Sequence, residues 1–255
     1  MTGARFIRLE RRGGALWIIM DRPPLNVLDI AMLEELEAAL SGPAVDAEAA
    51  AIVLTGAGKA FCAGVDVADH MGDRAAAMLR SFHAVIERLL GLAQPVLAVV
   101  NGAALGGGCE LLLACDVVIA RDGAKLGQPE IRLGVFPPAA AALLPGLIGR
   151  QRALDLILSG RTIKADEAYS LGLVSRVLPA DGFGEAAGAL VAQIAALSPP
   201  VLRLAKRAAS DGRADAGARL LAAERLYLGD LMKLDDAHEG LVAFLEKRAP
   251  VWKGA

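Results

Sequence analysis

One stretch, Val99 to Asp116, constrains the fold of this chain more than any other. An apolar run typical of a buried strand ends at Asn101–Gly102, three glycines follow at 106–108, and Cys109 to Cys115 has the composition of a buried helix. We therefore expect a strand to pass into a helix through a turn where glycine lets the backbone come close to a ligand. The first N–H groups of such a helix have no partner within it, so they suit an oxygen that gains negative charge.

Two carboxylates belong to this arrangement. Glu110 stands in the apolar helix directly after the glycines, and Glu130 follows a Gly-Gln-Pro turn further along the chain. A pair of carboxylates beside backbone donors provides the groups needed to add or remove water next to a carbonyl. Each feature alone also has a plainer interpretation, because a glycine run can be only a tight turn and the helix dipole favours a glutamate in a first turn.

A third stretch, Lys59 to His70, follows a strand-like run and reaches a small-residue turn at Ala63–Gly64. The three stretches contain KAFCAGVDV, NGAALGGGCELLLACDVVIA and GQPEIRLGVFP, which resemble the signature blocks of the enoyl-CoA hydratase/isomerase (crotonase) superfamily. The resemblance extends from DRPPLNVLD near the start to EGLVAFLEKR near the end. It implies an α/β fold, a right-handed spiral of repeated ββα units with a C-terminal helical region. Periodicity alone does not distinguish this spiral from a doubly wound sheet.

The resemblance assigns chemical roles within the blocks. The backbone N–H groups of Val65 and Gly107 correspond to the family's oxyanion hole for a thioester oxygen. Glu110 and Glu130 correspond to the acid/base pair that acts on one water molecule, and their proximity would push their pKa values apart. Relatives that act as isomerases, dehalogenases or decarboxylases generally lack one of these glutamates, so the pair favours hydration or its reverse.

The resemblance also implies a binding surface for an acyl-CoA, in which coenzyme A is part of the substrate, so that no separate cofactor is expected. The expected binding residues are Leu25, Asn26, Ala63, Asp66, Val67, Ala68, Gly106, Pro137 and Pro138. For Leu25 and Asn26 a purely structural role, in a turn and a cap, stays open, and Asp66 fits a turn former better than a catalytic acid. Three basic residues are candidates for the coenzyme A phosphates, although such residues are more often solvated: Arg22, Lys59 and Lys247.

One departure from the family pattern follows Glu130. Straight-chain enoyl-CoA hydratases continue with Pro-Gly-x-Gly-Gly, whereas this chain has Phe136-Pro137-Pro138 and then four alanines at 139–142. The exchange is either a neutral change of helix-starting residues, since proline suits a helix N-terminus, or a reshaped acyl pocket. With the blocks GVDVADH and GQPEIRLGVFPP, it makes the chain similar to the cyclohexa-1,5-diene-1-carbonyl-CoA hydratases of anaerobic aromatic degradation. A short-chain enoyl-CoA hydratase and a Δ3,Δ2-enoyl-CoA isomerase are the alternatives.

Composition narrows the classes of partner. A formal net charge of −2 gives no electrostatic signature of nucleic-acid binding, which argues against a crotonase-like RNA-binding protein. No uninterrupted apolar run reaches the roughly 20 residues of a membrane span, and the N-terminus lacks the apolar core of a signal peptide. We therefore expect a cytoplasmic protein that does not bind a membrane.

The cysteines and histidines offer further candidates for chemistry. Three cysteines, Cys62, Cys109 and Cys115, lack metal-ligand spacing, so we expect no metal site and interpret them as reduced packing residues. A reactive thiol at Cys62 or Cys109 is the alternative. His70 flanks the third block, and contact with a substrate is possible for it, although a lone histidine is usually a surface or hydrogen-bonded residue.

Apolar residues at helical spacing predict an amphipathic helix over 74–90 that covers the site. Asp29 can cap the helix that follows it, and residues 150–159 and 164–171 are typical of two further helices.

The character of the chain changes near Ser198. We expect a spiral core that contains the acyl-CoA site over residues 1–197 and a helical oligomerisation region over residues 198–255. The second region has more apolar faces than it can cover by itself, so it must pack on the core or on a neighbouring subunit. The resemblance implies the second arrangement, in a homo-oligomer that is a trimer or a hexamer.

Overall fold

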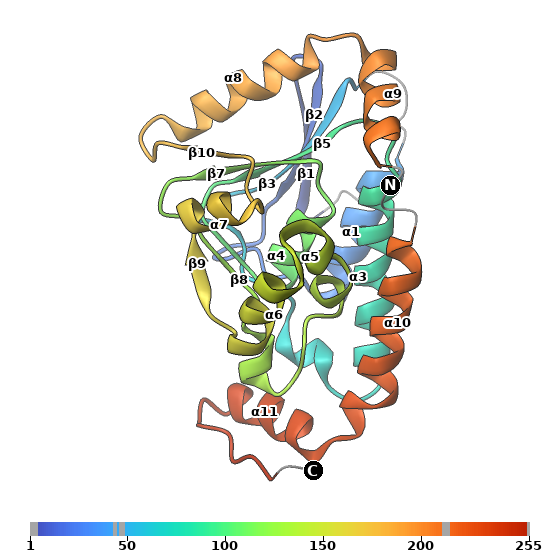
Figure 1. Ribbon diagram of the computed structural model, residues 1–255, viewed down its shortest axis with the longest axis vertical. Helices are drawn as coiled ribbons and strands as arrows, with labels where there is room; N and C mark the ends of the chain where they lie inside the picture. Colours follow the sequence, from blue (N-terminus) through green and yellow to red (C-terminus); the bar gives the residue numbers. More distant parts are fainter. Residues whose placement is uncertain (1–4, 43–44, 46–48, 211–214, 254–255) are drawn as a thin grey trace.

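The strands of this computed structural model, which describes residues 5–42, 45, 49–210 and 215–253, form two sheets (Figure 1). The larger sheet has the order β1 (Ile7–Arg12), β2 (Ala15–Met20), β3 (Ala51–Gly56), β5 (Val96–Val100), β7 (Val117–Arg121) and β10 (Arg176–Leu178). The smaller sheet has the order β4 (Ala60–Cys62), β6 (Ala103–Leu105), β8 (Lys125–Gly127) and β9 (Thr162–Lys164).

A repeating unit builds both sheets. Strand β3 of the larger sheet leads to β4 of the smaller sheet and then to helix α3 (Arg74–Gly91). Strands β5 and β6 with helix α4 (Gly107–Leu113) repeat this order, as do β7 and β8 with helix α5 (Pro138–Ile148). Successive units pair in parallel within each sheet. The expected spiral of ββα units is thus confirmed.

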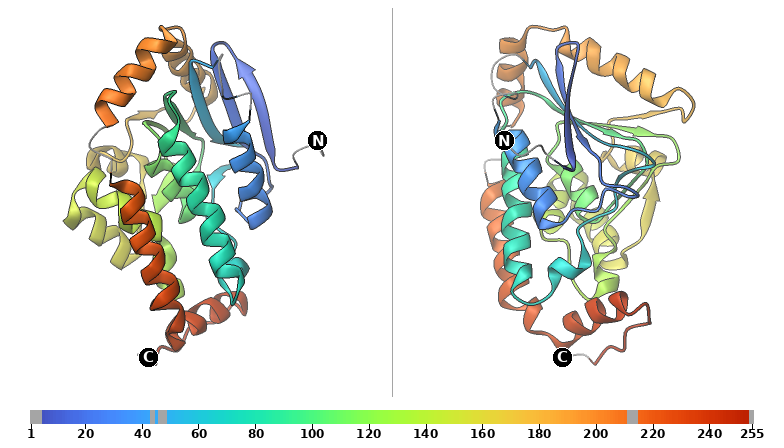
Figure 2. Two further views of the ribbon diagram at one scale, coloured as in Figure 1. Left: turned by 90° about the vertical axis from the view of Figure 1, so that its right-hand side faces the viewer. Right: turned by 180° about the vertical axis from the view of Figure 1, so that it is seen from behind.

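Strands β2, β3 and β5 of the larger sheet are buried along their whole length because both faces of the sheet are covered there. On β2, Leu16 and Ile18 face the main hydrophobic core, whereas Trp17 and Ile19 belong to a second cluster. Helix α8 (Phe183–Ala195) completes this second cluster, and Figure 2 shows the helix across the outer face of the sheet.

Local sequence signals place several helices as predicted. The predicted Asp29 cap begins α1 (Ile30–Ser41), because the carboxylate of Asp29 accepts a hydrogen bond of 2.9 Å from the Met32 N–H. The helices predicted from Arg74, Arg150 and Lys164 correspond to α3, α6 (Arg150–Ser159) and α7 (Ala165–Leu171).

Helix α4 begins earlier than predicted. Instead of covering Cys109 to Cys115 it covers Gly107 to Leu113, so two of the three glycines lie inside its first turn. The reason is close packing against β4, because a Cβ atom on Gly108 would lie 2.2 Å from the carbonyl oxygen of Cys62. Gly106 precedes the helix with a φ of 51°, a conformation that suits glycine.

The C-terminal helices pack against the spiral of their own chain. They are α9 (Pro199–Ser210), α10 (Ala216–Gly229) and α11 (Asp235–Leu245), with a short 3-10 helix η4 (Leu231–Lys233). Helix α10 runs beside α3 and also contacts α5, and its Leu220 and Tyr227 belong to the main hydrophobic core (Figure 2). Helix α11 contacts two 3-10 helices, η1 (Val67–His70) and η2 (Pro129–Leu133). The division at residue 198 therefore stays a prediction, since one core serves both parts.

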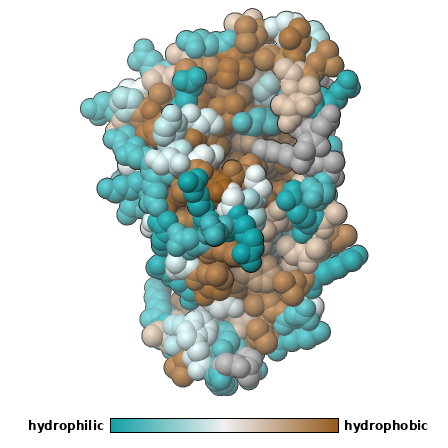
Figure 3. All heavy atoms as spheres, viewed as in Figure 1, coloured by the Kyte–Doolittle hydropathy of each residue, from teal (hydrophilic) through white to brown (hydrophobic). Residues whose placement is uncertain are grey.

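Several apolar side chains of the C-terminal helices remain exposed. Val201 and Leu204 of α9 are 62% and 56% exposed, and Phe244 and Leu245 of α11 are 52% and 47% exposed. On the face drawn in Figure 3, apolar side chains gather at the upper end of the molecule. Among the described helices, none alone has the length and hydropathy of a bilayer span; the bent pair 183–195 and 199–209 meets that criterion by length and composition.

Candidate active site

A pocket of about 450 Å³ opens at one edge of the smaller sheet. Strands β4, β6 and β8 are parallel, so their carboxyl ends share this edge, where α/β sheets commonly bind ligands. The pocket is lined by Ala63 to Val65 after β4, by Gly106 and Gly107 after β6, and by Glu130 after β8. Three successive repeats thus contribute corresponding positions to one wall, which we call the strand-end wall.

Two backbone N–H groups of the strand-end wall have no acceptor. Leu28 and Val65 form an isolated parallel bridge in which the N–H groups of Leu28 and Asp66 are bonded, and within the described residues the Val65 N–H finds no partner. The Gly107 N–H, the first in α4, likewise has none among the described residues. The two segments are in contact, because a Cβ atom on Gly107 would lie 2.7 Å from Cγ2 of Val65.

Glu110 reaches the pocket from the first turn of α4 and is only 4% exposed. Its Oε1 accepts a hydrogen bond of 2.8 Å from the N–H of Ala140, in the first turn of α5. Burial raises the pKa of Glu110 to about 7, while hydrogen bonds from the N–H groups of Ala140 and Ala139 act in the opposite direction. Near neutral pH this carboxyl group can therefore accept or release a proton.

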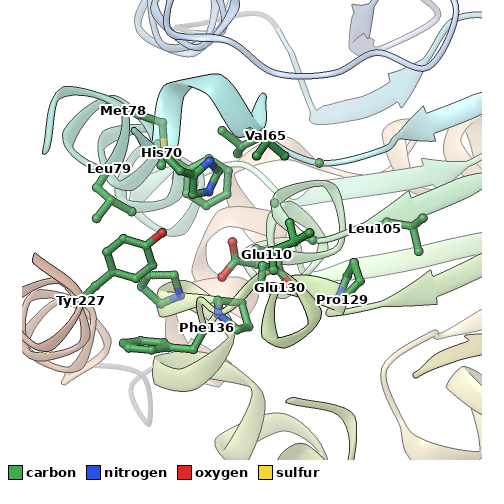
Figure 4. A pocket seen from close by; sticks show the side chains of 18 of the residues that line it. Val65, His70, Met78, Leu79, Leu105, Glu110, Pro129, Glu130, Phe136 and Tyr227 are labelled. Carbon is green, nitrogen blue, oxygen red and sulfur yellow. The ribbon is translucent and has the colours of Figure 1, made fainter. Parts of the chain in front are cut away.

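Glu130 lies on η2 and faces the same pocket (Figure 4). Burial raises its pKa well above the ordinary value, and the charge of Glu110 raises the pKa further. Its Oε2 is buried without a partner among the described residues, and only glycine fits opposite, since a Cβ atom on Gly106 would lie 2.5 Å from Oε1. At neutral pH the pair therefore retains a proton and offers both a proton donor and a proton acceptor.

The opposite side of the pocket, which we call the helical wall, is mainly apolar. It consists of residues from η1, α3, η2, the start of α5, α10 and α11, and includes Val67, His70, Met78, Leu79, Phe82, Arg132, Leu133, Phe136, Pro137, Pro138, Tyr227 and Phe244. The amphipathic face predicted for 74–90 thus lines the pocket. His70 lines it too, with Nδ1 located 3.1 Å from the Asp66 carbonyl oxygen, and burial lowers the pKa of this imidazole.

Four expected binding residues do not line the pocket: Leu25, Asn26, Asp66 and Ala68. Asn26 is 1% exposed, and its Nδ2 donates hydrogen bonds to the carbonyl oxygens of Ala57 and Ala60 at 3.0 and 2.9 Å, so its position favours the structural interpretation of this turn. Asp66 caps η1 by accepting a hydrogen bond of 3.0 Å from the N–H of Ala68, as a turn former would.

Leu25 is 44% exposed beside the strand-end wall, and its carbonyl oxygen accepts a hydrogen bond of 3.0 Å from the Ala63 N–H. Contact of coenzyme A with Leu25, Asp66 or Ala68 stays a prediction. Of the basic candidates, Arg22 forms an ion pair of 2.7 Å with Asp29 and donates to a backbone carbonyl, so it stabilises its own turn. Lys59 is exposed between β3 and β4, and Lys247 is exposed after α11.

The cysteines do not have the surroundings of reactive thiols. Cys62 and Cys109 are buried, and burial raises the pKa of each to about 12, so both are neutral thiols near pH 7. Among the described residues, no group of three or more His, Cys, Asp or Glu side chains could hold a metal ion.

Sequence reasoning missed two polar features of the helical wall. Tyr227 occupies the buried face of α10 with Leu220, a helical spacing that indicated only packing. The second feature lies behind this wall and joins α3 to α10: His83 Nδ1 lies 2.5 Å from Glu224 Oε2, and because burial lowers the pKa of His83 the contact is a hydrogen bond near neutral pH. His83 lies on the predicted amphipathic face, but nothing local in the sequence indicates its distant partner.

Comparisons with known proteins agree with this geometry. The model of the enoyl-CoA hydratase/isomerase family matches residues 10–255. Cyclohexa-1,5-dienecarbonyl-CoA hydratase of Thauera aromatica is 41% identical over 246 residues, which cover 96% of this chain and 95% of the relative. Short-chain-enoyl-CoA hydratase of Clostridium acetobutylicum is 36% identical over 247 residues and 94% of each chain. A crystal structure of enoyl-CoA hydratase from Bacillus anthracis superimposes with a TM-score of 0.78 at 38% identity, over 98% of this chain and 100% of that chain.

Proposed function

The chain belongs to the enoyl-CoA hydratase/isomerase family, and from this premise we propose that Glu110 and Glu130 add water across the double bond of an α,β-unsaturated acyl-CoA thioester. Its relatives are hydro-lyases, and enoyl-CoA hydratase activity is the class to which this chain belongs. One observation supports the residue assignment above all: two buried carboxyl groups with raised pKa values face one pocket.

In the proposed reaction the thioester oxygen accepts hydrogen bonds from the N–H groups of Val65 and Gly107. These donors stabilise the negative charge of the enolate-like transition state, and one such donor typically contributes about 3 kcal/mol. Glu110 accepts a proton from water as the water oxygen bonds to the β-carbon, and Glu130 donates its proton to the α-carbon. Burial and the charge of Glu110 raise the pKa of Glu130, which supports its role as proton donor, and dehydration follows the same steps in reverse.

For the acyl group we propose a cyclic conjugated thioester, cyclohexa-1,5-diene-1-carbonyl-CoA. The apolar helical wall supports this choice, because Phe136, Pro137 and Pro138 present rigid carbon surface where a flat ring can pack. The similarity to the Thauera aromatica enzyme also supports it. A short-chain enoyl-CoA is the second candidate, supported by the relative from Clostridium acetobutylicum. An isomerase would shift a proton with one base and leave the second carboxyl group without a role.

The test is a side-by-side assay of the purified chain with crotonyl-CoA and cyclohexa-1,5-diene-1-carbonyl-CoA, in which ultraviolet absorbance and mass report the addition of one water. We expect Glu110→Gln and Glu130→Gln each to lower the rate by about 10²- to 10⁴-fold. Glu34→Gln, an exposed carboxylate on α1, is the matched control. Unchanged rates in the two pocket variants would contradict the mechanism, and hydration of crotonyl-CoA alone would contradict the cyclic substrate.

We also propose that the chain forms a homo-oligomer, a trimer or a hexamer. The exposed apolar side chains of α9 and α11 support this proposal, since a neighbouring subunit would cover them. Light scattering of the purified chain gives the mass of the assembly, and a monomer at micromolar concentration would contradict the proposal.

A further inference from the structure

The hydroxyl group of Tyr227 is a polar group that the proposed mechanism does not use. The residue is 1% exposed and lines the pocket, and its hydroxyl is buried without a hydrogen-bond partner among the described residues. Figure 4 shows this hydroxyl directed into the pocket, on the side of the two glutamates. A buried hydroxyl without a partner destabilises a folded protein, so this arrangement calls for an occupant that accepts its hydrogen bond.

The phenol is a neutral donor. Burial and the charges of Glu130 and Glu110 raise its pKa far above the ordinary value. Its ring is held in place by an edge-on contact with Phe136, with 5.4 Å between ring centroids. The His83–Glu224 hydrogen bond joins α10 to α3 one turn before Tyr227. The donor is thus preorganised before any ligand enters.

The start of α5 leaves a place for such a donor. Pro137 and Pro138 line the pocket and have no N–H, and the N–H groups of Ala139 and Ala140 are directed at Glu110. The N–H groups of Val65 and Gly107 lie on the strand-end wall, where the thioester oxygen is proposed to bind. The oxygen atom that water contributes therefore has no backbone donor from α5, and Tyr227 faces the same space.

We propose that the hydroxyl of Tyr227 donates a hydrogen bond to the water oxygen that the two glutamates activate, and to the hydroxyl group that this oxygen becomes in the product. This inference rests on the proposed hydration. It gives the water oxygen a third polar contact besides Glu110 and Glu130, and this contact comes from the C-terminal helices. It also gives the pocket a means to distinguish a hydroxyacyl-CoA from the saturated acyl-CoA of the same length.

The first experiment compares Tyr227→Phe with Tyr169→Phe. These are the two tyrosines of the chain, and Tyr169 is 56% exposed on α7. With whichever thioester the wild type hydrates, we expect Tyr227→Phe to lower kcat by about 10- to 100-fold with KM changed less than threefold, and Tyr169→Phe to leave both unchanged. Equal kcat values for Tyr227→Phe and the wild type would overturn the proposal.

The second experiment does not depend on turnover. Calorimetry measures the Kd of racemic 3-hydroxybutyryl-CoA and of butyryl-CoA for Glu130→Gln and for Glu130→Gln/Tyr227→Phe, because the first substitution blocks the reaction. We expect the preference for the hydroxyacyl ligand to fall about tenfold when the phenol is lost. If both ligands weaken by the same factor, Tyr227 is a packing residue and the proposal fails. A wild type that hydrates neither thioester would refute the proposed function, whereas this binding ratio still decides the role of Tyr227.

Discussion

The strand-end wall and the helical wall of the pocket are made in different ways. On the strand-end wall, backbone N–H groups and two carboxylates follow the ends of β4, β6 and β8, and glycine allows their close approach. On the helical wall, side chains from helices distant in sequence meet through packing, and behind it the His83–Glu224 hydrogen bond joins α10 to α3. The first wall depends on short local motifs, whereas the second depends on packing between helices that are distant in the sequence.

This difference assigns different work to the two walls. In the proposed reaction the strand-end wall provides the groups that stabilise charge and move protons. The helical wall is mostly carbon, and we propose that it determines which acyl group fits. We therefore expect substitutions on the first wall to affect the rate of the chemical step, and substitutions of apolar residues on the second to affect the stability of α10 and the choice of ligand. Tyr227, the proposed donor on the helical wall, is the exception, because its loss should lower kcat.

Among substitutions that keep both glutamates, the largest expected effect is on the strand-end wall, in Gly107→Ala. The added Cβ would lie 2.7 Å from Val65 Cγ2 and 3.2 Å from Phe82 Cε2, so the segments that contain the two proposed oxyanion donors must shift relative to each other. We expect kcat/KM for hydration to fall by about 10²- to 10³-fold. Gly188→Ala in α8, where nothing lies within 4 Å of the new Cβ, is the control and should keep the wild-type rate. A Gly107→Ala enzyme with the wild-type rate would remove the distinction between the walls.

The next effect concerns the cost of burying the glutamate pair in its charged form. Burial raises the folded-state pKa of Glu110 to about 7 and that of Glu130 above its ordinary value, so protonation of these carboxyl groups stabilises the fold. This contribution to stability is complete below the unfolded-state pKa of about 4.5. It is lost as the pH rises through the folded values. Glu130→Gln should therefore be more stable than the wild type by about 2 kcal/mol at about pH 8, with little difference at about pH 5.

Urea unfolding at both pH values measures this difference, with Glu34→Gln as the control that keeps the wild-type dependence. A wild type whose stability relative to Glu130→Gln does not change with pH would mean that the pair is already neutral or solvated. The strand-end wall would then have no cost of buried charge, and this difference from the helical wall would disappear.

The smallest expected effect is on the helical wall, in the contact between α3 and α10. A double-mutant cycle of His83→Ala and Glu224→Ala should give a coupling energy of about 1 kcal/mol, because the pair is largely buried. Urea unfolding of the four proteins measures it. Additive effects of the two substitutions would show that packing alone positions α10, and that the hydrogen bond has no part in the helical wall.

The sequence allowed the strand-end wall to be predicted almost completely. Its glycines, glutamates and small-residue turns act through backbone conformation within a few residues, and such signals are local. The start of α4 was two residues in error because the contact of Gly108 with Cys62 joins segments far apart in the chain. The strands of the smaller sheet, three residues each, were missed since they are too short to show an alternating pattern.

The helical wall could be predicted only in part. The apolar spacing in 74–90 indicated a covering helix, but Tyr227 has the same spacing as its apolar neighbours and its pocket contact depends on the tilt of α10. The spacing of Asn26 likewise gave no sign that its amide would bond to the segment 57–61. Both contacts result from packing between segments that are distant in the chain, and such packing leaves no local signal in the sequence.

The ββα repeat has a consequence for how this pocket can change. The chemical groups of the strand-end wall follow the short strands of three repeats: Val65 follows β4, Gly107 and Glu110 follow β6, and Glu130 follows β8, and the three strands hold one another in parallel register. A substitution after one strand therefore changes the groups of that repeat while those of the other two keep their frame. In this architecture the chemistry can therefore change by substitution within a single repeat. The C-terminal helices that line the helical wall can vary separately, and we expect such changes to alter which ligand fits.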